Sequence, residues 1–467
     1  MKNGSAGRRS FAVPSSPARR LTLAALLSVV GVAAAVISAY YVYSVSRPRL
    51  RSAVPETAAH AGREVGALML EADAAVGRLV DRYPYAPQAW AAAAVLHHRV
   101  GKRDQADELW RQCLELDSSL VDAHFALGQS AHERGDYAAA IAAFARAAEL
   151  DTQSLVYPIH QAKVLADAGR AGEAARVLED LGRKQPMSVT VMVMLGETYL
   201  QLKQYEKARE NLESAVRLAP DLASPRYSLA TALTRLGQVD KAQPHLQVFR
   251  RLKERDAEEH RQRLKRAASL ADVQRDMADV HAEIGKAYLV QGDAAAGEQS
   301  LRRAIELDPS STAAPLMLAW LYQQQGRGEN ALHVLQSSWK AAPDDLTLMM
   351  TLAGLAEELG RYDEAERAYR RMIELCPTRA SGYAALAGLY LRQGVRAAEA
   401  AELAAQAVNL EPVPSFYALL AATREQSGDT AGAIAAIEHA IQIDPGNGQY
   451  RQARAAIEAR AARQIAR

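Results

Sequence analysis

Residues 189–222 read VTVMVMLGETYLQLKQYEKARENLESAVRLAPDL, and this stretch decides the fold. Gly196 and Ala208 are small residues at its positions 8 and 20, where they allow two helices to touch closely. Larger apolar residues such as Leu212 fill the remaining space between the helices. Pro220 at position 32 lacks an N–H group and restrains the residue before it, so a helix ends there. The stretch therefore predicts a pair of packed helices.

The same pattern recurs with a period of 34 residues, and a glycine near position 15 of most copies favours the left-handed end of the first helix. Ten copies start at Pro87, Val121, Leu155, Val189, Ala223, Ala278, Thr312, Leu346, Ala380 and Pro414. The first five form array one, residues 87–256, and the other five form array two, residues 278–447. Residues 46–86 are predicted to be a linker with a degenerate repeat, and residues 448–467 a polar helix that caps the array.

This arrangement of small residues at positions 8, 20 and 27, with proline at 32, resembles the tetratricopeptide repeat family, and in particular its membrane-anchored bacterial type. The resemblance covers roughly three quarters of the chain. It implies an all-α fold, a right-handed superhelical solenoid with one N-terminal transmembrane helix. It also implies a protein that binds other proteins, as a peptide or a helix in the concave groove of the stacked repeats.

The N-terminal region predicts a membrane anchor. Residues 21–45 contain no charged residue and exceed the roughly 20 residues that cross a bilayer. A cleaved signal peptide remains the alternative interpretation. Residues 1–20 form a basic arm with five Lys or Arg residues, against three arginines at positions 47, 49 and 51. This bias predicts a single-pass inner-membrane protein with its repeats on the periplasmic, extracytoplasmic side.

Residues 257–277 interrupt the period between the two arrays. With residues 249–256 they form a charge-dense stretch without glycine or proline, which is typical of an extended, solvated helix. The segment could be a longer second helix without a task of its own, or a hinge or docking spur between the arrays.

The residue inventory argues against an enzyme and against a cofactor. The chain has no phosphate-binding glycine loop, HEXXH motif or serine nucleophile elbow, and paired acids such as Glu357 and Glu358 are expected to be solvated charges. Cys113 and Cys376 are too few for a zinc cage and are interpreted as buried small residues. The formal net charge of +2 argues against nucleic acid as a partner.

The predicted binding residues lie on the first helix of each repeat, which lines the groove in this family. They are Phe125, Gln129, Lys163, Glu197, Tyr227, Arg235, Lys286 and Trp320. Some of these side chains could instead pack between neighbouring first helices. The Lys and Asn clamp with which chaperone-binding relatives hold a terminal carboxylate is missing, because position 5 of the first five repeats is Ala91, Phe125, Ile159, Val193 and Tyr227. The expected function is a non-enzymatic scaffold for an envelope, polysaccharide or secretion complex; the alternative is a regulatory or recruiting subunit of a membrane enzyme complex.

Overall fold

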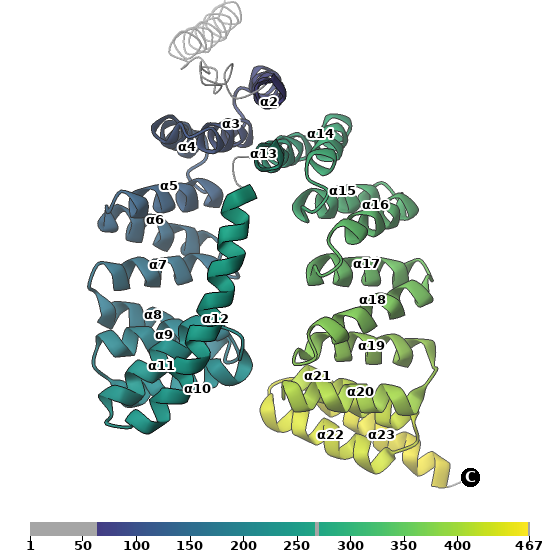
Figure 1. The fold of residues 1–467 in the computed structure, drawn as a ribbon. Coiled ribbons are helices and arrows are strands. Elements are labelled where there is room, and N and C mark those ends of the chain that lie inside the picture. Colours follow the sequence, from purple (N-terminus) through teal and green to yellow (C-terminus); the bar gives the residue numbers. More distant parts are fainter. Residues whose placement is uncertain (1–62, 267–269, 466–467) are drawn as a thin grey trace, which may run out of the picture. The chain divides into compact units, whose positions relative to one another are not determined.

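The structure, a computed structural model, describes residues 63–266 and 270–465, and every regular element in these ranges is an α-helix (Figure 1). Array one consists of five helix pairs that begin at the predicted residues or one residue later. Their bounds are α3 (Pro87–Arg99) and α4 (Arg103–Leu116), α5 (Val121–Glu133) and α6 (Tyr137–Leu150), α7 (Val156–Asp167) and α8 (Ala171–Lys184), α9 (Val189–Gln201) and α10 (Tyr205–Leu218), and α11 (Ala223–Arg235) and α12 (Val239–Arg266).

Array two repeats the same arrangement and ends in an additional helix. Its pairs are α13 (Leu270–Val290) and α14 (Ala294–Leu307), α15 (Ala313–Gln324) and α16 (Gly328–Ala341), α17 (Leu346–Glu358) and α18 (Tyr362–Leu375), α19 (Ala380–Gln393) and α20 (Ala397–Leu410), and α21 (Pro414–Gln426) and α22 (Thr430–Ile443), followed by α23 (Gly448–Ile465). Ile457 of α23 is buried against the last pair, and Arg460 forms a 2.8 Å ion pair with Glu425. The C-terminal helix therefore covers the last repeat.

The small residues act as the repeat pattern predicts. A Cβ atom added to Gly196 of α9 would lie only 2.7 Å from Cδ2 of Leu212, a fully buried side chain of α10. Gly285 of α13 makes the same kind of close approach to Leu301 of α14. Because the side chain of the second helix occupies the space of the missing Cβ, glycine sets the distance between the two helices.

The turn between the two helices of a repeat needs a residue in the left-handed region. Gly135 at position 15 has φ +76°, and position 15 is a glycine with positive φ in most other repeats. Lys203 takes this position in the fourth repeat, with φ 58°, and Arg396 has φ 49° two residues after Gly394 in the ninth repeat. These two turns therefore carry a conformational cost of about 1 kcal/mol that glycine would avoid.

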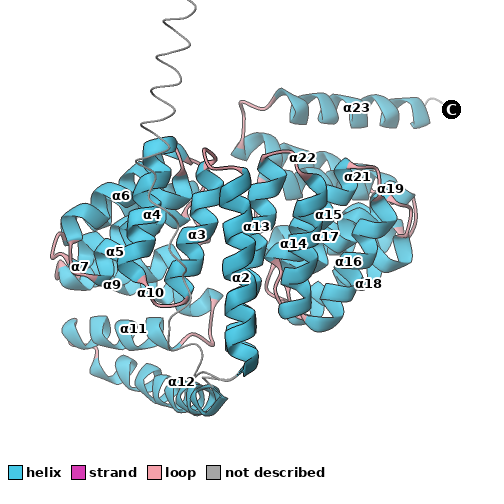
Figure 2. Ribbon diagram, turned by 90° about the horizontal axis from the view of Figure 1, so that it is seen from above, coloured by secondary structure: helices cyan, strands magenta, loops and turns pink. Residues whose placement is uncertain are grey.

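A 20-residue helix, α2 (Arg63–Arg82), precedes array one. It lies within residues 46–86, the predicted linker and degenerate repeat, and its Ala72, Val76 and Leu79 are completely buried. Helix α13 packs against both α2 and α3 as well as against its own partner α14 (Figure 2). It has 21 residues, longer than the other first helices, and Met277 of its added N-terminal turns is buried. Array two thus contacts the start of array one directly.

The interruption between the arrays is divided between two helices. Residues 257–266 continue α12, a 28-residue helix, and residues 270–277 begin α13, while 267–269 lie outside the described residues. Leu252 of α12 is buried, and the side chains described after it, Lys253 to Arg255 and Ala257, are exposed.

The predicted membrane anchor lies outside the described residues. No helix within residues 63–266 and 270–465 is both long enough and apolar enough to cross a bilayer. The basic arm, residues 1–20, and the predicted transmembrane helix, residues 21–45, both lie outside this part of the chain.

Candidate binding surface and pocket

The predicted groove residues lie on the surface that the first helices of the repeats form, here called the helix-A face. Tyr227 is 53% exposed and Trp320 is 54% exposed, although both side chains are large and aromatic. Tyr227 also contacts Phe249 of α12, with 5.1 Å between the ring centroids. Three polar residues of the predicted set are exposed as well: Gln129, Lys163 and Arg235. The helix-A face therefore carries accessible aromatic rings in both arrays.

Glu197 connects neighbouring first helices instead of pointing freely into solvent. Its Oε1 accepts hydrogen bonds from the hydroxyls of Ser224 at 2.9 Å and Ser228 at 3.0 Å, both on α11. Hydrogen bonds to a charged group are among the stronger ones in proteins. Glu197 thus takes part in the packing of α9 against α11.

Phe125 is only partly accessible because it belongs to an aromatic cluster. Its ring centroid lies 5.7 Å from Phe144, 5.5 Å from Tyr157 and 5.1 Å from His160. Burial in this cluster lowers the pKa of His160, so the imidazole is neutral near pH 7. Phe125 therefore supports the packing of α5, α6 and α7 while one side of it remains in contact with a pocket.

Lys286 had been predicted to face the groove of array two, but its side chain reaches array one. Nζ lies 2.7 Å from Oδ2 of Asp122 on α5 and 3.6 Å from Oε2 of Glu283 on its own helix. Burial alone would lower the pKa of Lys286, but Glu283 and Asp122 raise it above its ordinary value. Lys286 is therefore a charged bridge between α13 and array one.

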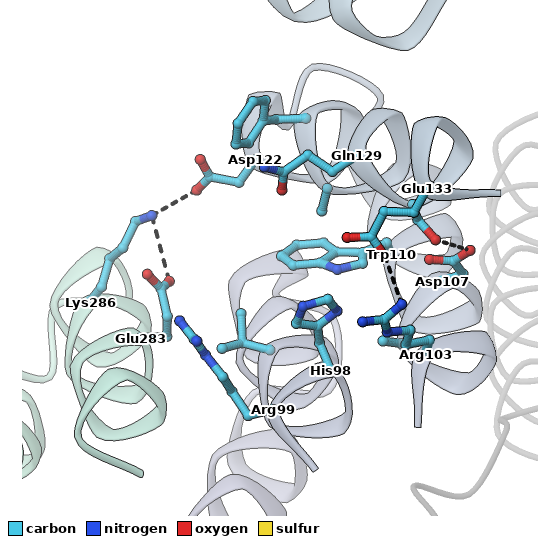
Figure 3. A pocket seen from close by; sticks show the side chains of 15 residues that line it. His98, Arg99, Arg103, Asp107, Trp110, Asp122, Gln129, Glu133, Glu283 and Lys286 are labelled. Carbon is cyan, nitrogen blue, oxygen red and sulfur yellow. Dashed lines mark hydrogen bonds and ion pairs between the residues drawn. The ribbon is translucent and has the colours of Figure 1, made fainter. Parts of the chain in front are cut away.

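This bridge forms one side of a pocket of about 380 Å³ between α3, α4, α5 and α13 (Figure 3). The aromatic rings of Trp110 and Phe125 line it from array one. Charged side chains surround these rings: Arg99, Arg103, Asp107, Asp122, Glu133, Glu283 and Lys286. Two of the predicted groove residues, Phe125 and Gln129, lie in this pocket, and Lys286 joins them from a helix about 160 residues further along the chain.

Sequence reasoning missed the acidic members of this pocket. Asp122, Glu283 and Trp110 occupy ordinary positions in their own repeats, and the sequence pattern singles out none of them as a binding residue. No local pattern pairs α13 with α3, because the contacts join residues that are 177 and 180 positions apart. Asp122 stands at position 2 of a first helix, and in this family the side chain at that position faces the groove. This position in the repeat was the one sequence signal that could have identified Asp122.

A second pocket of about 520 Å³ lies between α2, α13 and α14. Glu71 of α2 accepts two hydrogen bonds from the guanidinium of Arg303, at 2.7 and 2.9 Å. The buried His281 lies 3.8 Å from the same carboxylate. The hydrogen bond from Arg303 lowers the pKa of Glu71, and burial lowers the pKa of His281. These contacts join α2 to the first pair of array two.

The residues considered for chemistry have structural roles. Within the described ranges, no group of three or more His, Cys, Asp or Glu side chains is arranged to hold a metal ion. Burial raises the pKa of Cys113 to about 12, which leaves an unreactive thiol. The expectation that Glu357 is a solvated charge is wrong, because its side chain is 14% exposed and accepts a 2.6 Å hydrogen bond from Arg392. Glu357 therefore belongs to an ion pair between adjacent first helices.

Stacked helix pairs, in which each repeat contacts its neighbours, define a helical-repeat protein. Models of the tetratricopeptide repeat family match residues 121–154, 160–223, 223–247, 278–311, 316–380 and 414–447. The chain is a tetratricopeptide repeat protein, a protein–protein interaction scaffold of a family that is typically non-enzymatic.

Several solved structures are similar to parts of this chain at low identity. Yeast Tom70 is 17% identical, with a TM-score of 0.34, and the match covers 83% of this chain and 97% of that one. MamA from Desulfovibrio magneticus RS-1 is 18% identical, with a TM-score of 0.32, and covers 41% of this chain and 97% of its own. Cut9–Hcn1 of the APC/C is 14% identical, with a TM-score of 0.29, over 78% of this chain and 62% of that one. No curated protein matches the sequence. These likenesses support no inference about function.

Proposed function

We propose that this protein is a scaffold anchored in the inner membrane of a bacterium through residues 21–45, and that it binds a peptide or helix of a partner protein on the helix-A face. The observation that carries the proposal is the exposure of Tyr227 and Trp320, at 53% and 54%. Large aromatic side chains that remain accessible on a repeat surface are the residues that most often dominate the energetics of protein interfaces.

The two rings stand at different positions of their repeats, both on first helices. Trp320 lies at position 9 of the repeat that starts at Thr312, and Tyr227 at position 5 of the repeat that starts at Ala223. Since more than half of each side chain is exposed, truncation removes few internal contacts and should change folding little. Removal of an aromatic anchor should cost about 2 kcal/mol in binding, which corresponds to about a thirtyfold loss of affinity.

The test starts from chemical crosslinking in membranes followed by mass spectrometry, which identifies the partner. Binding of that partner is then titrated against the full-length protein and against the Tyr227→Ala and Trp320→Ala variants. Tyr362→Ala is the matched control, because Tyr362 is 46% exposed but starts a second helix, away from the helix-A face. Unchanged binding of both variants, or a loss that the Tyr362 control shares, would refute the proposal.

The membrane part of the proposal has a separate test. A single cysteine is introduced as Ser52→Cys in a chain whose two natural cysteines are replaced by alanine, and intact spheroplasts are treated with a membrane-impermeant thiol reagent. Labelling of intact spheroplasts is expected if the repeats lie on the extracytoplasmic side. Labelling that appears only after lysis would place them inside. Retention of the N-terminal peptide in the mature protein, measured by mass spectrometry, distinguishes an anchor from a cleaved signal.

A further inference from the structure

Helix α13 presents an acidic stripe to the start of array one. Asp276, Asp279 and Glu283 follow one another at intervals of three and four residues, so they share one face of the helix. Arg99 of α3 bridges the first two, with Nη1 3.3 Å from Asp276 and Nη2 2.6 Å from Asp279. The stripe therefore lies against the first repeat, beside the pocket that contains Trp110 and Phe125.

The ion pairs along this stripe contain fewer cations than carboxylates. Arg99 forms ion pairs with Asp276 and Asp279, and Lys286 forms ion pairs with Glu283 and with Asp122 of α5. Two cations are thus shared by four carboxylates. Burial raises the pKa of Glu283, Asp276 and Asp279, although Lys286 or Arg99 acts in the opposite direction. The negative charge on this side of the pocket is therefore incompletely compensated.

The opposite side of the pocket adds aromatic surface and another carboxylate. The rings of Trp110 and Phe125 line the cavity, and Glu133 of α5 stands at its edge, 2.8 Å from Arg103 (Figure 3). Asp122 and Glu133 are each about half exposed, at 50% and 51%, so an incoming group can reach them from solvent. An aromatic wall beside carboxylates is favourable for a planar cation, which can stack on a ring and donate hydrogen bonds in its plane.

We propose that this pocket receives an arginine side chain of the partner protein, with the guanidinium between the rings of Trp110 and Phe125 and the carboxylates of Asp122 and Glu283. The inference rests on the proposed function, because it names the chemistry of the partner at one end of the same helix-A face. An incoming guanidinium supplies the missing positive charge and competes with Lys286 for its two carboxylates. An acidic side chain would add to the uncompensated charge and is excluded from the pocket.

The test uses N-acetyl-arginine methylamide as the probe and the full-length protein labelled with 5-fluorotryptophan. The chain contains four tryptophans, and the fluorine signal of Trp110 is assigned by Trp110→Phe. The arginine probe should shift the Trp110 signal in a saturable way, whereas the glutamate and norleucine analogues should not. The lysine analogue should bind more weakly, because a compact ammonium group lacks the planar fork.

Two variants should change the affinity of the probe in opposite directions. Glu283→Gln should weaken binding about tenfold, and Lys286→Met, which removes the internal competitor, should strengthen it several-fold. Glu374→Gln is the matched control, because Glu374 is a helical carboxylate in an exposed ion pair with Arg371, away from this pocket. Melting curves of all three variants separate an effect on binding from an effect on folding. Asp122→Asn should weaken binding of the arginine probe in the same way as Glu283→Gln.

The outcomes distinguish this inference from the proposed function. Absence of a saturable shift, equal shifts with norleucine, or weaker binding by Lys286→Met would overturn the arginine pocket, and equal binding of the lysine analogue would overturn the choice of arginine. None of these results depends on the partner. Conversely, if the probe binds as expected but Tyr227→Ala and Trp320→Ala capture the partner normally, the helix-A-face proposal fails and the pocket stands.

Discussion

Two glycines on the first helices should respond in opposite directions to the same substitution. In Gly196→Ala the new Cβ would lie 2.7 Å from Cδ2 and 3.0 Å from Cδ1 of Leu212, and nearer still to its Cγ. Leu212 is completely buried. In Gly354→Ala the new Cβ would meet no heavy atom within 4 Å.

The magnitudes follow from overpacking and helix propensity. Insertion of a methyl group into a filled contact costs about 1–3 kcal/mol. Alanine in the middle of a helix is more favourable than glycine by about 1 kcal/mol. The new Cβ would lie so close to Leu212 that the overpacking cost should be near the upper end of this range. After the gain in helix propensity is subtracted, Gly196→Ala should destabilise its repeat by about 1–2 kcal/mol. Gly354→Ala has no overpacking cost, because its new Cβ meets no neighbouring atom, and it should stabilise its repeat by about 1 kcal/mol.

The measurement is hydrogen exchange, because a repeat array loosens locally before it unfolds as a whole. Amides of α9 and α10 should lose protection in Gly196→Ala while those of α17 and α18 remain as in the parent protein. Gly354→Ala should increase protection in α17 and α18. Unchanged protection around residues 189–222 in Gly196→Ala, or loosening by Gly354→Ala, would refute the account of glycine as the spacing residue.

Three further predictions concern the turn, the thiols and pH. Lys203→Gly should raise the stability of its repeat by about 1 kcal/mol in urea melts, since φ is 58° there, and a decrease would contradict the strain. Cys113, with a pKa near 12, should resist iodoacetamide at pH 8 in the folded protein, whereas the partly exposed Cys376 should be alkylated; mass spectrometry decides. The pKa of Glu71 is lowered by Arg303, so the carboxylate stabilises the fold above its unfolded pKa of about 4.5 and loses this effect as the pH falls through the lowered value. Once the pH drops below about 4.5, the hydrogen-exchange protection factors of α2 should therefore decrease. In Arg303→Met these protection factors should already be lower at neutral pH and should decrease less on acidification.

Much of the local architecture could be predicted because its causes lie close together in the sequence. Gly196 and Leu212 belong to the same repeat, and Gly135 ends a helix through its own backbone preference. Even the departures are local, since Lys203 adopts the conformation of the glycine that the pattern demands at position 15. The exposed predicted anchors, Tyr227 and Trp320, follow from the repeat phase alone.

The orientation of single groove residues could be predicted less well. Glu197 and Phe125 stand at facing positions, yet one bonds two serines of the next first helix and the other joins an aromatic cluster. A repeat position determines which way the backbone presents a side chain. The neighbouring repeat determines which partners that side chain finds, and those partners differ from repeat to repeat.

The amino-acid sequence by itself determined the helix pairs, their order and their turns, because each repeat contacts mainly its neighbours and the 34-residue period records those contacts. Only the tertiary structure decided that α13 packs on α2 and α3, that Lys286 pairs with Asp122 and Arg99 with Asp279, and hence that a pocket exists between them. These partners are 164 and 180 residues apart. Their distance depends on small rotations and translations summed over the three or four repeats that lie between them, a quantity that no single repeat contains.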